Sequence, residues 1–208
     1  MRFTDRRQAG ALLGEAVARL GPIRPVVLGL PRGGVPVAAP VAQALGCDLD
    51  VLVIRKLGVP HQPELAMGAL GEGGTIVRND EVLRLAGVSP AQFEQVVMRE
   101  EAELTRRLAL YRPDAGPVDV EDKTVIVVDD GLATGATARV AVAVLRERSP
   151  GQVWVAVPVA PRDTKEVMEN EADRVIVLET PRFFGAVGAW YDEFKQTTDD
   201  EVRSLLIH

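Results

Sequence analysis

Short apolar runs recur along the chain, and most are separated by stretches with the periodicity of an amphipathic helix. The runs that favour strands are 25–30, 48–54, 125–128, 152–160 and 174–179. Unbroken runs of valine, isoleucine and leucine are typical of strands buried on both faces, as in a parallel sheet. Strands that alternate with helices in this way predict an α/β fold, with a mainly parallel twisted sheet flanked by helices.

Helical patterns occupy most of the connections between these runs. A first helix is predicted over about 5–21. A much longer helix is predicted over 89–111, where Ser89 and Gln92 have the spacing of a capping box. The segment from about 80 to 112 is therefore expected to be a helical insertion, which packs on the rest of the domain or serves as an oligomer contact or a brace.

Two segments do not fit the alternation of strands and helices. Residues 55–74 are rich in glycine and proline and predict a flexible loop, and long loops in compact domains are often functional. The tail, about 180–208, gathers most of the aromatic residues and is expected to form a C-terminal hood or brace. With these two additions, residues 1–208 are predicted to form a single domain.

Composition narrows the class of protein. The chain has 208 residues, of which 47% are hydrophobic and 26% are charged, as in ordinary soluble domains. A net charge of −6 offers no general basic surface, so nucleic acid is not an expected partner. One cysteine excludes an internal disulfide, and no apolar run reaches the length of a membrane span. The N-terminus lacks a signal-peptide pattern, so we expect a cytoplasmic protein without membrane partners.

The most specific chemical pattern follows the apolar run 125–128. Asp129 and Asp130 end this strand, and a turn of small residues leads into the next helix. Backbone N–H groups in such a turn can close on a phosphate at the helix N-terminus, and the helix dipole favours the anion. The residues expected to bind the phosphate are Ala133, Thr134, Gly135, Ala136 and Thr137. The two carboxylates suit ribose hydroxyls or a hydrated Mg²⁺ ion.

Other phosphate-binding motifs do not match this turn. A Walker A loop needs a lysine before its final hydroxyl residue, and a dinucleotide fingerprint needs a different glycine spacing. A structural alternative is that Asp129 and Asp130 only end a strand and cap a helix. The combination of strand, acidic pair and small-residue loop favours the binding of a sugar phosphate.

The run VIVVDDGLATGAT resembles the signature of type I phosphoribosyltransferases, which bind phosphoribosyl pyrophosphate (PRPP). The resemblance implies the fold of that family with a small hood subdomain, and a Mg²⁺-dependent transfer of ribose 5-phosphate from PRPP to a nitrogenous base or similar acceptor. Asp129 and Asp130 would then orient the ribose and meet Mg²⁺ through water, and pyrophosphate would leave. Family members are commonly dimers, so a homodimer is expected.

The same resemblance assigns residues to the leaving pyrophosphate. In the family, the loop after the first strand binds pyrophosphate, often through a non-proline cis peptide. Here that loop holds Arg32, Gly33 and Gly34. Arg55 and Lys56 correspond to basic residues that meet pyrophosphate from the flexible loop, although a basic pair at a strand end can also be solvated only. His61 and Glu64 are weaker candidates in the same segment.

The acceptor is left open by the sequence. Enzymes for 6-oxopurines carry an aspartate where this chain has Ala133, whereas adenine-type enzymes carry an alanine; the orotate-type loop pattern is incomplete. Aromatic rings of the tail could stack on a planar base or could anchor the tail to the core. The acceptor-binding candidates are Phe183, Phe184, Trp190 and Tyr191.

Two other classes of function remain at this stage. One is a regulator that senses PRPP or a nucleotide without transferring the sugar. The other is a hydrolase or another enzyme that uses the same sugar-phosphate pocket.

Overall fold

The computed structural model describes residues 2–112 and 116–206, and its contacts divide the chain into two compact units. Unit 1 comprises the residues up to Leu52 and those from Pro117 onward, and unit 2 comprises Val53–Gly116. The sequence predicted one domain over the whole chain. The two units arise because residues 55–111 form a sheet and helices that pack on one another.

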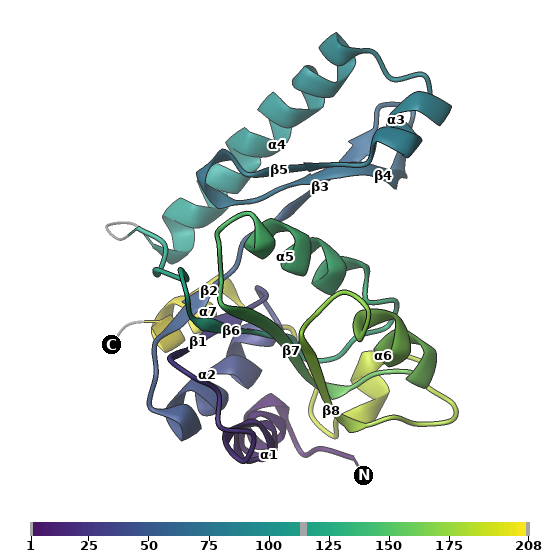
Figure 1. Cartoon of the computed structure of the whole chain (residues 1–208). Helices are drawn as coiled ribbons and strands as arrows, with labels where there is room; N and C mark the ends of the chain where they lie inside the picture. Colours follow the sequence, from purple (N-terminus) through teal and green to yellow (C-terminus); the bar gives the residue numbers. More distant parts are fainter. Residues whose placement is uncertain (1, 113–115, 207–208) are drawn as a thin grey trace. The chain divides into compact units, whose positions relative to one another are not determined.

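Unit 1 is a five-stranded sheet in which every pairing is parallel, in the order β2-β1-β6-β7-β8 (Figure 1). This confirms the predicted α/β fold with a mainly parallel sheet. The strands are β1 Pro25–Gly29, β2 Leu49–Val51, β6 Thr124–Val128, β7 Gln152–Val159 and β8 Arg174–Glu179. The helices of unit 1 are α1 Arg6–Ala18, α2 Gly34–Leu45, α5 Ala136–Arg146, α6 Arg162–Met168 and α7 Asp199–Leu206, with a 3-10 turn η2 at Val187–Trp190.

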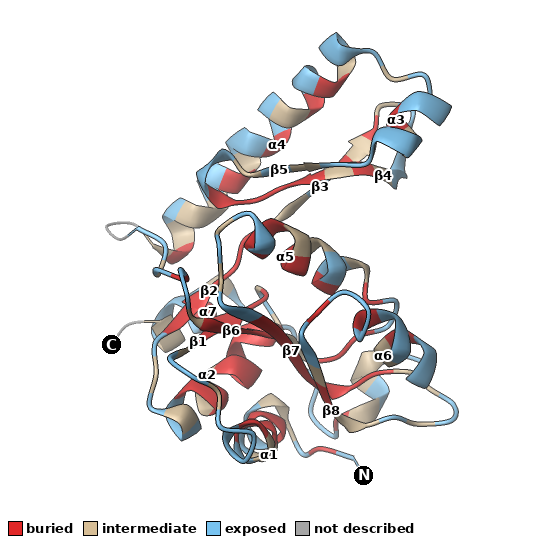
Figure 2. Ribbon diagram, viewed as in Figure 1, coloured by how far each residue is buried: buried red, intermediate tan, exposed pale blue. Residues whose placement is uncertain are grey.

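Both faces of the unit 1 sheet are covered by apolar helix faces. Alternate strand residues such as Val27, Ile126 and Trp154 pack with α1 and α2 in one buried cluster. Figure 1 shows these two helices below the sheet and α5 above it. Strands β1, β2, β6 and β7 are accordingly buried along most of their length, as Figure 2 shows for β6 and β7, whereas β8 at the edge is mostly half-buried. Burial on both faces accounts for the unbroken β-branched sequences of these strands.

Unit 2 is a small antiparallel sheet with two helices. Its strands are β3 Arg55–Val59, β4 Gln62–Leu70 and β5 Ile76–Arg78, in the order β3-β4-β5, with a 3-10 turn η1 at Glu72–Gly74. Its helices are α3 Asp80–Leu85 and α4 Pro90–Tyr111. The capping box predicted for the long helix is present, because the Ser89 N–H donates to Gln92 Oε1 and the Gln92 N–H to Ser89 Oγ.

The prediction of an irregular loop over 55–74 is wrong in its local structure, because these residues supply β3, β4 and η1. The loop was predicted from the glycines of this segment, but these glycines have another role. A Cβ on Gly58 would overlap the carbonyl of Pro63, so this glycine lets the two strands approach closely. Leu57 of β3 and Met67 of β4 are fully buried, as expected of strands that belong to a core. Flexibility of this segment stays a prediction.

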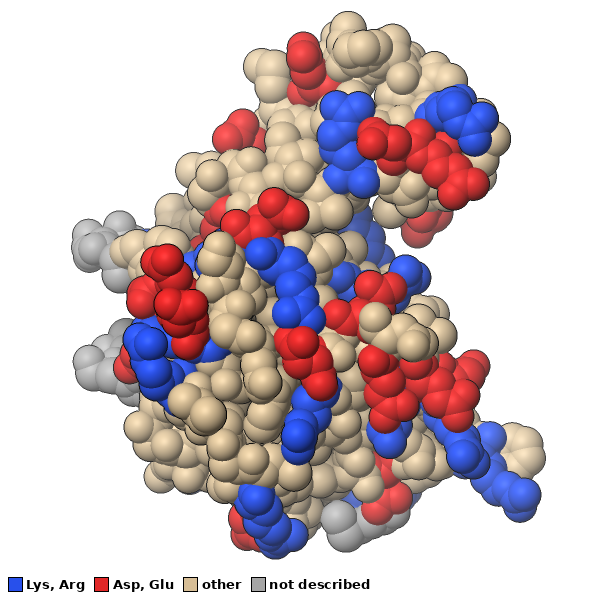
Figure 3. Space-filling model, viewed as in Figure 1, with Lys and Arg blue, Asp and Glu red and all other residues tan. Residues whose placement is uncertain are grey.

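Two findings concern the predictions about membranes and surface charge. None of its helices is both long enough and apolar enough to cross a membrane. On the face drawn in Figure 3, Lys and Arg side chains are interspersed with Asp and Glu and do not form a continuous basic strip.

Candidate active site

The loops that follow β1 and β6 lie side by side at the carboxyl edge of the unit 1 sheet. The Leu30 N–H donates to the carbonyl of Val128 at 2.9 Å, so the pairing of the two strands continues into the loops. A Cβ on Gly34 would lie 2.5 Å from Val128 O and 3.0 Å from Asp129 Cα. Only glycine allows this approach. The structure therefore brings the predicted pyrophosphate loop and the acidic pair together in unit 1.

The two carboxylates of the acidic pair have different partners. Asp129 Oδ1 accepts the backbone N–H of Asp130 at 2.9 Å. Asp130 Oδ2 is bound by Arg6, whose Nε and Nη2 lie 2.9 and 2.8 Å away. The Tyr191 hydroxyl donates to the backbone carbonyl of Asp130 at 2.6 Å. Side chain and main chain of Asp130 are thus both held by residues from the two ends of the chain.

Burial dominates the electrostatics of the pair. It raises the pKa of Asp129 from its usual range to about 8, and the neighbouring charge of Asp130 acts in the same direction. Burial also raises the pKa of Asp130, against which the positive charge of Arg6 acts. Both carboxyl groups therefore hold protons more readily than ordinary aspartates, and a cation or hydroxyl donors from a ligand would favour their ionised forms.

This burial predicts a pH dependence of stability. Because the folded-state pKa of Asp129 lies above its unfolded-state value, the native state binds more protons between about pH 4 and pH 8, and stability falls as pH rises through this window. We expect Asp129→Asn to be more stable than wild type by at least about 1 kcal/mol at about pH 8.5, with little difference at about pH 4. Thermal denaturation in the presence of a chelator measures this. Equal pH dependence of stability in the two proteins would contradict a raised pKa of Asp129.

The predicted phosphate loop precedes α5, as expected. Gly135 is the N-cap residue and has φ of +71°, a left-handed conformation that favours glycine. Ala133, Thr134 and Thr137 are exposed, so the loop presents backbone and hydroxyl groups to solvent at the N-terminus of an 11-residue helix. This is the arrangement that binds anions at helix N-termini.

Thr164 of α6 supports the loop from behind and was missed by the sequence reading. Its hydroxyl donates to the carbonyl of Ala133 at 2.9 Å, and a Cβ on Gly135 would lie 3.1 Å from its methyl group. This hydrogen bond fixes the orientation of the Ala133 carbonyl in the loop. We expect Thr164→Val to weaken the binding of a phosphate ester by roughly fivefold, because a loop carbonyl is released, whereas Thr164→Ser should bind as wild type does. Calorimetric titration compares the variants; equal affinities would show that the bond does not order the loop.

The other predicted pyrophosphate residues divide between the two units. Arg32 is exposed in the loop beside the acidic pair, and the peptide bond between Pro31 and Arg32 is cis. Arg55 lies in unit 2, where its Nε and Nη2 bind Glu100 Oε2 at 2.9 and 2.7 Å. Arg55 therefore has a structural partner within unit 2. Lys56 is exposed in the same strand. Contacts of Arg55 and Lys56 with pyrophosphate stay predictions.

Aromatic residues of the tail pack within unit 1 against the first residues of the chain. Tyr191 is 2% exposed, and its ring centroid lies 5.6 Å from that of Phe3 and 5.1 Å from that of Phe194. Its assignment to acceptor stacking is therefore corrected: the ring is packed in the core. Trp190 donates from Nε1 to the carbonyl of Phe184. Phe183 is 90% exposed and stays a candidate for contact with an acceptor.

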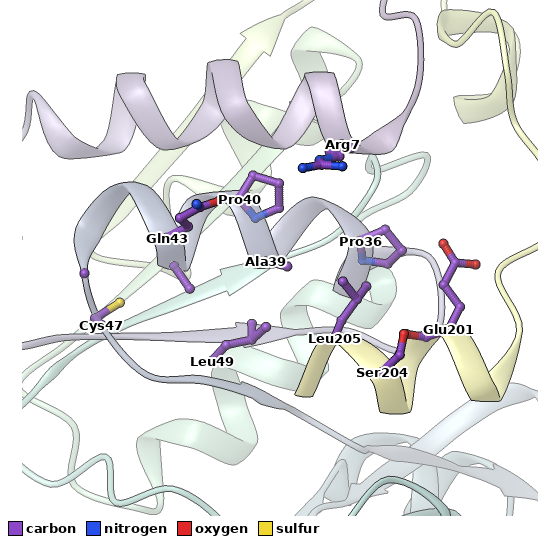
Figure 4. A pocket seen from close by; sticks show the side chains of 12 residues that line it. Arg7, Pro36, Ala39, Pro40, Gln43, Cys47, Leu49, Glu201, Ser204 and Leu205 are labelled. Atoms are coloured by element: carbon purple, nitrogen blue, oxygen red, sulfur yellow. The ribbon is translucent and has the colours of Figure 1, made fainter. Parts of the chain in front are cut away.

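A separate cavity of about 780 Å³ lies in unit 1 between α2 and α7, and Figure 4 shows Arg7, Pro40 and Ser204 on its walls. None of its lining residues belongs to the acidic pair or the phosphate loop. Over residues 2–112 and 116–206, no group of three or more His, Cys, Asp or Glu side chains is placed to hold a metal ion. A metal at the acidic pair would need oxygen ligands from a bound substrate, which is how Mg²⁺ commonly binds.

Comparisons with known proteins show the family of the chain and its fold. The model of the phosphoribosyl transferase domain family matches residues 7–193. Two Mycobacterium tuberculosis proteins, MT0597 of strain CDC 1551 and Rv0571c of strain H37Rv, are 47% identical over 204 residues, and both bear the provisional name phosphoribosyl transferase. The match covers 98% of this chain and 46% of each relative, so the chain spans about half the length of the curated relatives it matches. The crystal structure of TT1426 from Thermus thermophilus is 45% identical with a TM-score of 0.91, and the match covers 99% of this chain and 98% of that one.

The fold and the match together define a transferase class, in which an acidic pair and a phosphate loop share the carboxyl edge of a parallel sheet. The chain belongs to the phosphoribosyl transferase domain family.

Proposed function

We propose that this protein transfers the ribose 5-phosphate group of PRPP to a nitrogenous base or similar acceptor, with Mg²⁺ and with release of pyrophosphate. One observation carries the proposal. The acidic pair after β6, the glycine loop after β1 and the phosphate loop before α5 belong to one edge of the unit 1 sheet. In open α/β sheets this edge is where ligands bind.

The phosphate loop would hold the 5-phosphate of PRPP. Backbone N–H groups at the start of α5 and the hydroxyl groups of Thr134 and Thr137 supply donors, and the helix dipole adds a favourable field. The anchored phosphate would fix the sugar relative to the edge of the sheet. Fixing the reacting group in this way lowers the entropic part of the barrier.

The acidic pair would hold the ribose. Carboxylate oxygens accept hydrogen bonds from hydroxyl groups, and their negative charge favours the positive charge that develops at the anomeric carbon as pyrophosphate departs. Arg32 and Gly33 lie beside the pair and would bind the departing pyrophosphate. The Gly34 N–H donates to the carbonyl of Leu30 at 2.9 Å, so Gly34 would contribute by letting the loop approach Asp129 closely. When bound, Mg²⁺ would neutralise part of the pyrophosphate charge, with Asp129, Asp130 and substrate oxygens as its ligands.

Two residues, Ala133 and Phe183, bear on the nature of the acceptor. Ala133 places no carboxylate beside the phosphate loop, which speaks against proton exchange with a 6-oxopurine at this position. Phe183 offers an exposed ring in the tail. A homodimer and a place in the cytoplasm, in nucleotide metabolism, belong to the same proposal.

The test is pyrophosphate release from PRPP with Mg²⁺, measured across a panel of purine and pyrimidine bases. Turnover with at least one base, lost on removal of Mg²⁺ by a chelator, is the expected result. Tight PRPP binding without turnover for any acceptor would favour a PRPP sensor. Hydrolysis of PRPP at the same rate with and without every base would favour a hydrolase.

A further inference from the structure

Arg6 occupies one oxygen of the acidic pair although it lies 124 positions away in the sequence. Two of its nitrogens, Nε and Nη2, lie within 2.9 Å of Asp130 Oδ2. The side chains of Arg6 and Asp130 are 12% and 15% exposed, so the ion pair is largely shielded from water. A shielded, charge-assisted pair fixes geometry far better than an exposed one.

Arg6 is itself held from both ends of the chain. It is the first residue of α1, whose N-cap residue Asp5 accepts the N–H of Gln8. Its Nη1 donates to the carbonyl of Lys195 at 2.7 Å, and its guanidinium lies 3.9 Å from the centroid of the Phe194 ring. These contacts leave the guanidinium little freedom to turn away from Asp130.

The terminal segments are also joined through their backbones. The Phe3 N–H donates to the carbonyl of Trp190, and the Asp192 N–H donates to the carbonyl of Phe3, both at 2.8 Å. The start of α1 and the aromatic tail therefore form one structure behind the acidic pair. Arg6 is the side chain of this structure that reaches Asp130, while Tyr191 reaches its backbone.

One oxygen of each carboxylate is engaged by a neighbouring residue, which leaves the other oxygen to accept from a ligand. Asp129 Oδ1 accepts the Asp130 N–H, and Asp130 Oδ2 faces Arg6. Within the described ranges, Asp129 Oδ2 and Asp130 Oδ1 receive no hydrogen bond from another residue. Two oxygens held by neighbouring residues match the two neighbouring hydroxyl groups of a ribose, each of which can donate one hydrogen bond.

We propose that Arg6 is a positioning residue that turns Asp130 so that one of its oxygens meets a ribose hydroxyl. The inference rests on the proposed function. Arg6 binds the oxygen that the sugar does not use, and its positive charge offsets part of the repulsion between the acidic pair and an anionic sugar phosphate. The terminal segments thus contribute to recognition of the sugar, although no signature residue lies in them.

The experiment compares two ligands by calorimetric titration. Ribose 5-phosphate reports on the sugar and phosphate contacts together, and methyl phosphate reports on the phosphate loop alone. The variants are Arg6→Lys, which keeps the charge but not the two-nitrogen contact with Oδ2, and Arg6→Gln, which removes the charge. Arg7→Gln is the matched control, because Arg7 is the next residue of α1, is exposed and lines the separate cavity.

We expect Arg6→Lys to weaken ribose 5-phosphate binding by about tenfold and to leave methyl phosphate binding unchanged. Arg6→Gln should weaken ribose 5-phosphate binding at least as much, and Arg7→Gln should match wild type for both ligands. An Arg6→Lys protein that binds ribose 5-phosphate as wild type does would overturn the proposal. Equal weakening of both ligands by Arg6→Lys would also overturn it, because a role in overall folding would move both.

Failure of the proposed function gives a different result. If wild type binds methyl phosphate and ribose 5-phosphate equally well, the acidic pair does not recognise the sugar, and the proposed function and the role of Arg6 both fail. If wild type prefers ribose 5-phosphate but Arg6→Lys keeps the full preference, only the role of Arg6 fails.

Discussion

A protein with both Asp129→Asn and Asp130→Asn is expected to lose PRPP-dependent turnover by at least about 10³-fold. The amides keep nearly the same shape, so the ribose still fits, but the negative charge that would favour an oxocarbenium-like transition state is gone. Removing one preorganised electrostatic group of a site typically lowers kcat by about 10²–10³-fold. Steady-state pyrophosphate release measures the loss.

The control for this variant is Asp122→Asn, since Asp122 is an exposed residue before β6 with φ of +53°, a conformation that asparagine tolerates. It should turn over at the wild-type rate. Circular dichroism establishes that both proteins fold. A folded double variant with turnover within about threefold of wild type would show that the pair only ends β6 and has no part in the reaction.

Glu72→Gln is expected to lower the stability of unit 2 by about 3 kcal/mol. Glu72 and Arg112 form an ion pair whose side chains are 4% and 8% exposed, and Glu72 Oε1 also accepts the Val53 N–H at 3.2 Å. Glutamine keeps that acceptor but removes the negative charge that faces the buried guanidinium. Removing one partner of a buried pair costs far more than removing a surface charge.

The exposed Glu64 of β4 provides the matched control, and Glu64→Gln should change stability by less than about 0.5 kcal/mol. Hydrogen exchange of β3 and β4 amides reports on unit 2 separately from unit 1. Faster exchange in these strands with unchanged exchange in β6 and β7 is the expected pattern. Equal protection of β3 and β4 in Glu72→Gln and wild type would contradict an energetic role for the ion pair.

The sequence was most informative where local pattern and chemistry coincide. β6 is an unbroken β-branched strand, and the residues after it could be assigned from their own properties: two carboxylates, then a loop with little bulk. Gly34 lies in the loop that the resemblance assigned to pyrophosphate, and the short distance between a Cβ there and Val128 O shows why that position needs glycine. Parallel pairing followed from the burial of both strand faces.

The local sequence pattern did not predict the structure where contacts between distant residues determine it. Residues 55–59 and 62–70 form a hairpin in which Gly58 lies against the Pro63 carbonyl. Glycine in a sequence signals a loop as readily as a close strand contact. Tyr191 could have stacked on a base or packed in the core, and only the position of Phe3 decides between them.

Arg6 shows the limit most clearly. A buried acidic pair implies a nearby cation, but the chain contains many arginines, and nothing in the local sequence of Arg6 distinguishes it from Arg7. The pairing depends on how both termini pack behind β6. Long-range packing of this kind leaves no short motif in the sequence.

The most direct test of the proposed function is a crystal structure of the protein with PRPP and Mg²⁺. We predict the 5-phosphate within hydrogen-bonding distance of the backbone N–H groups of residues 134–137, and the ribose hydroxyls on Asp129 and Asp130. PRPP bound elsewhere, with the loop before α5 making no phosphate contact and the acidic pair no sugar contact, would contradict it.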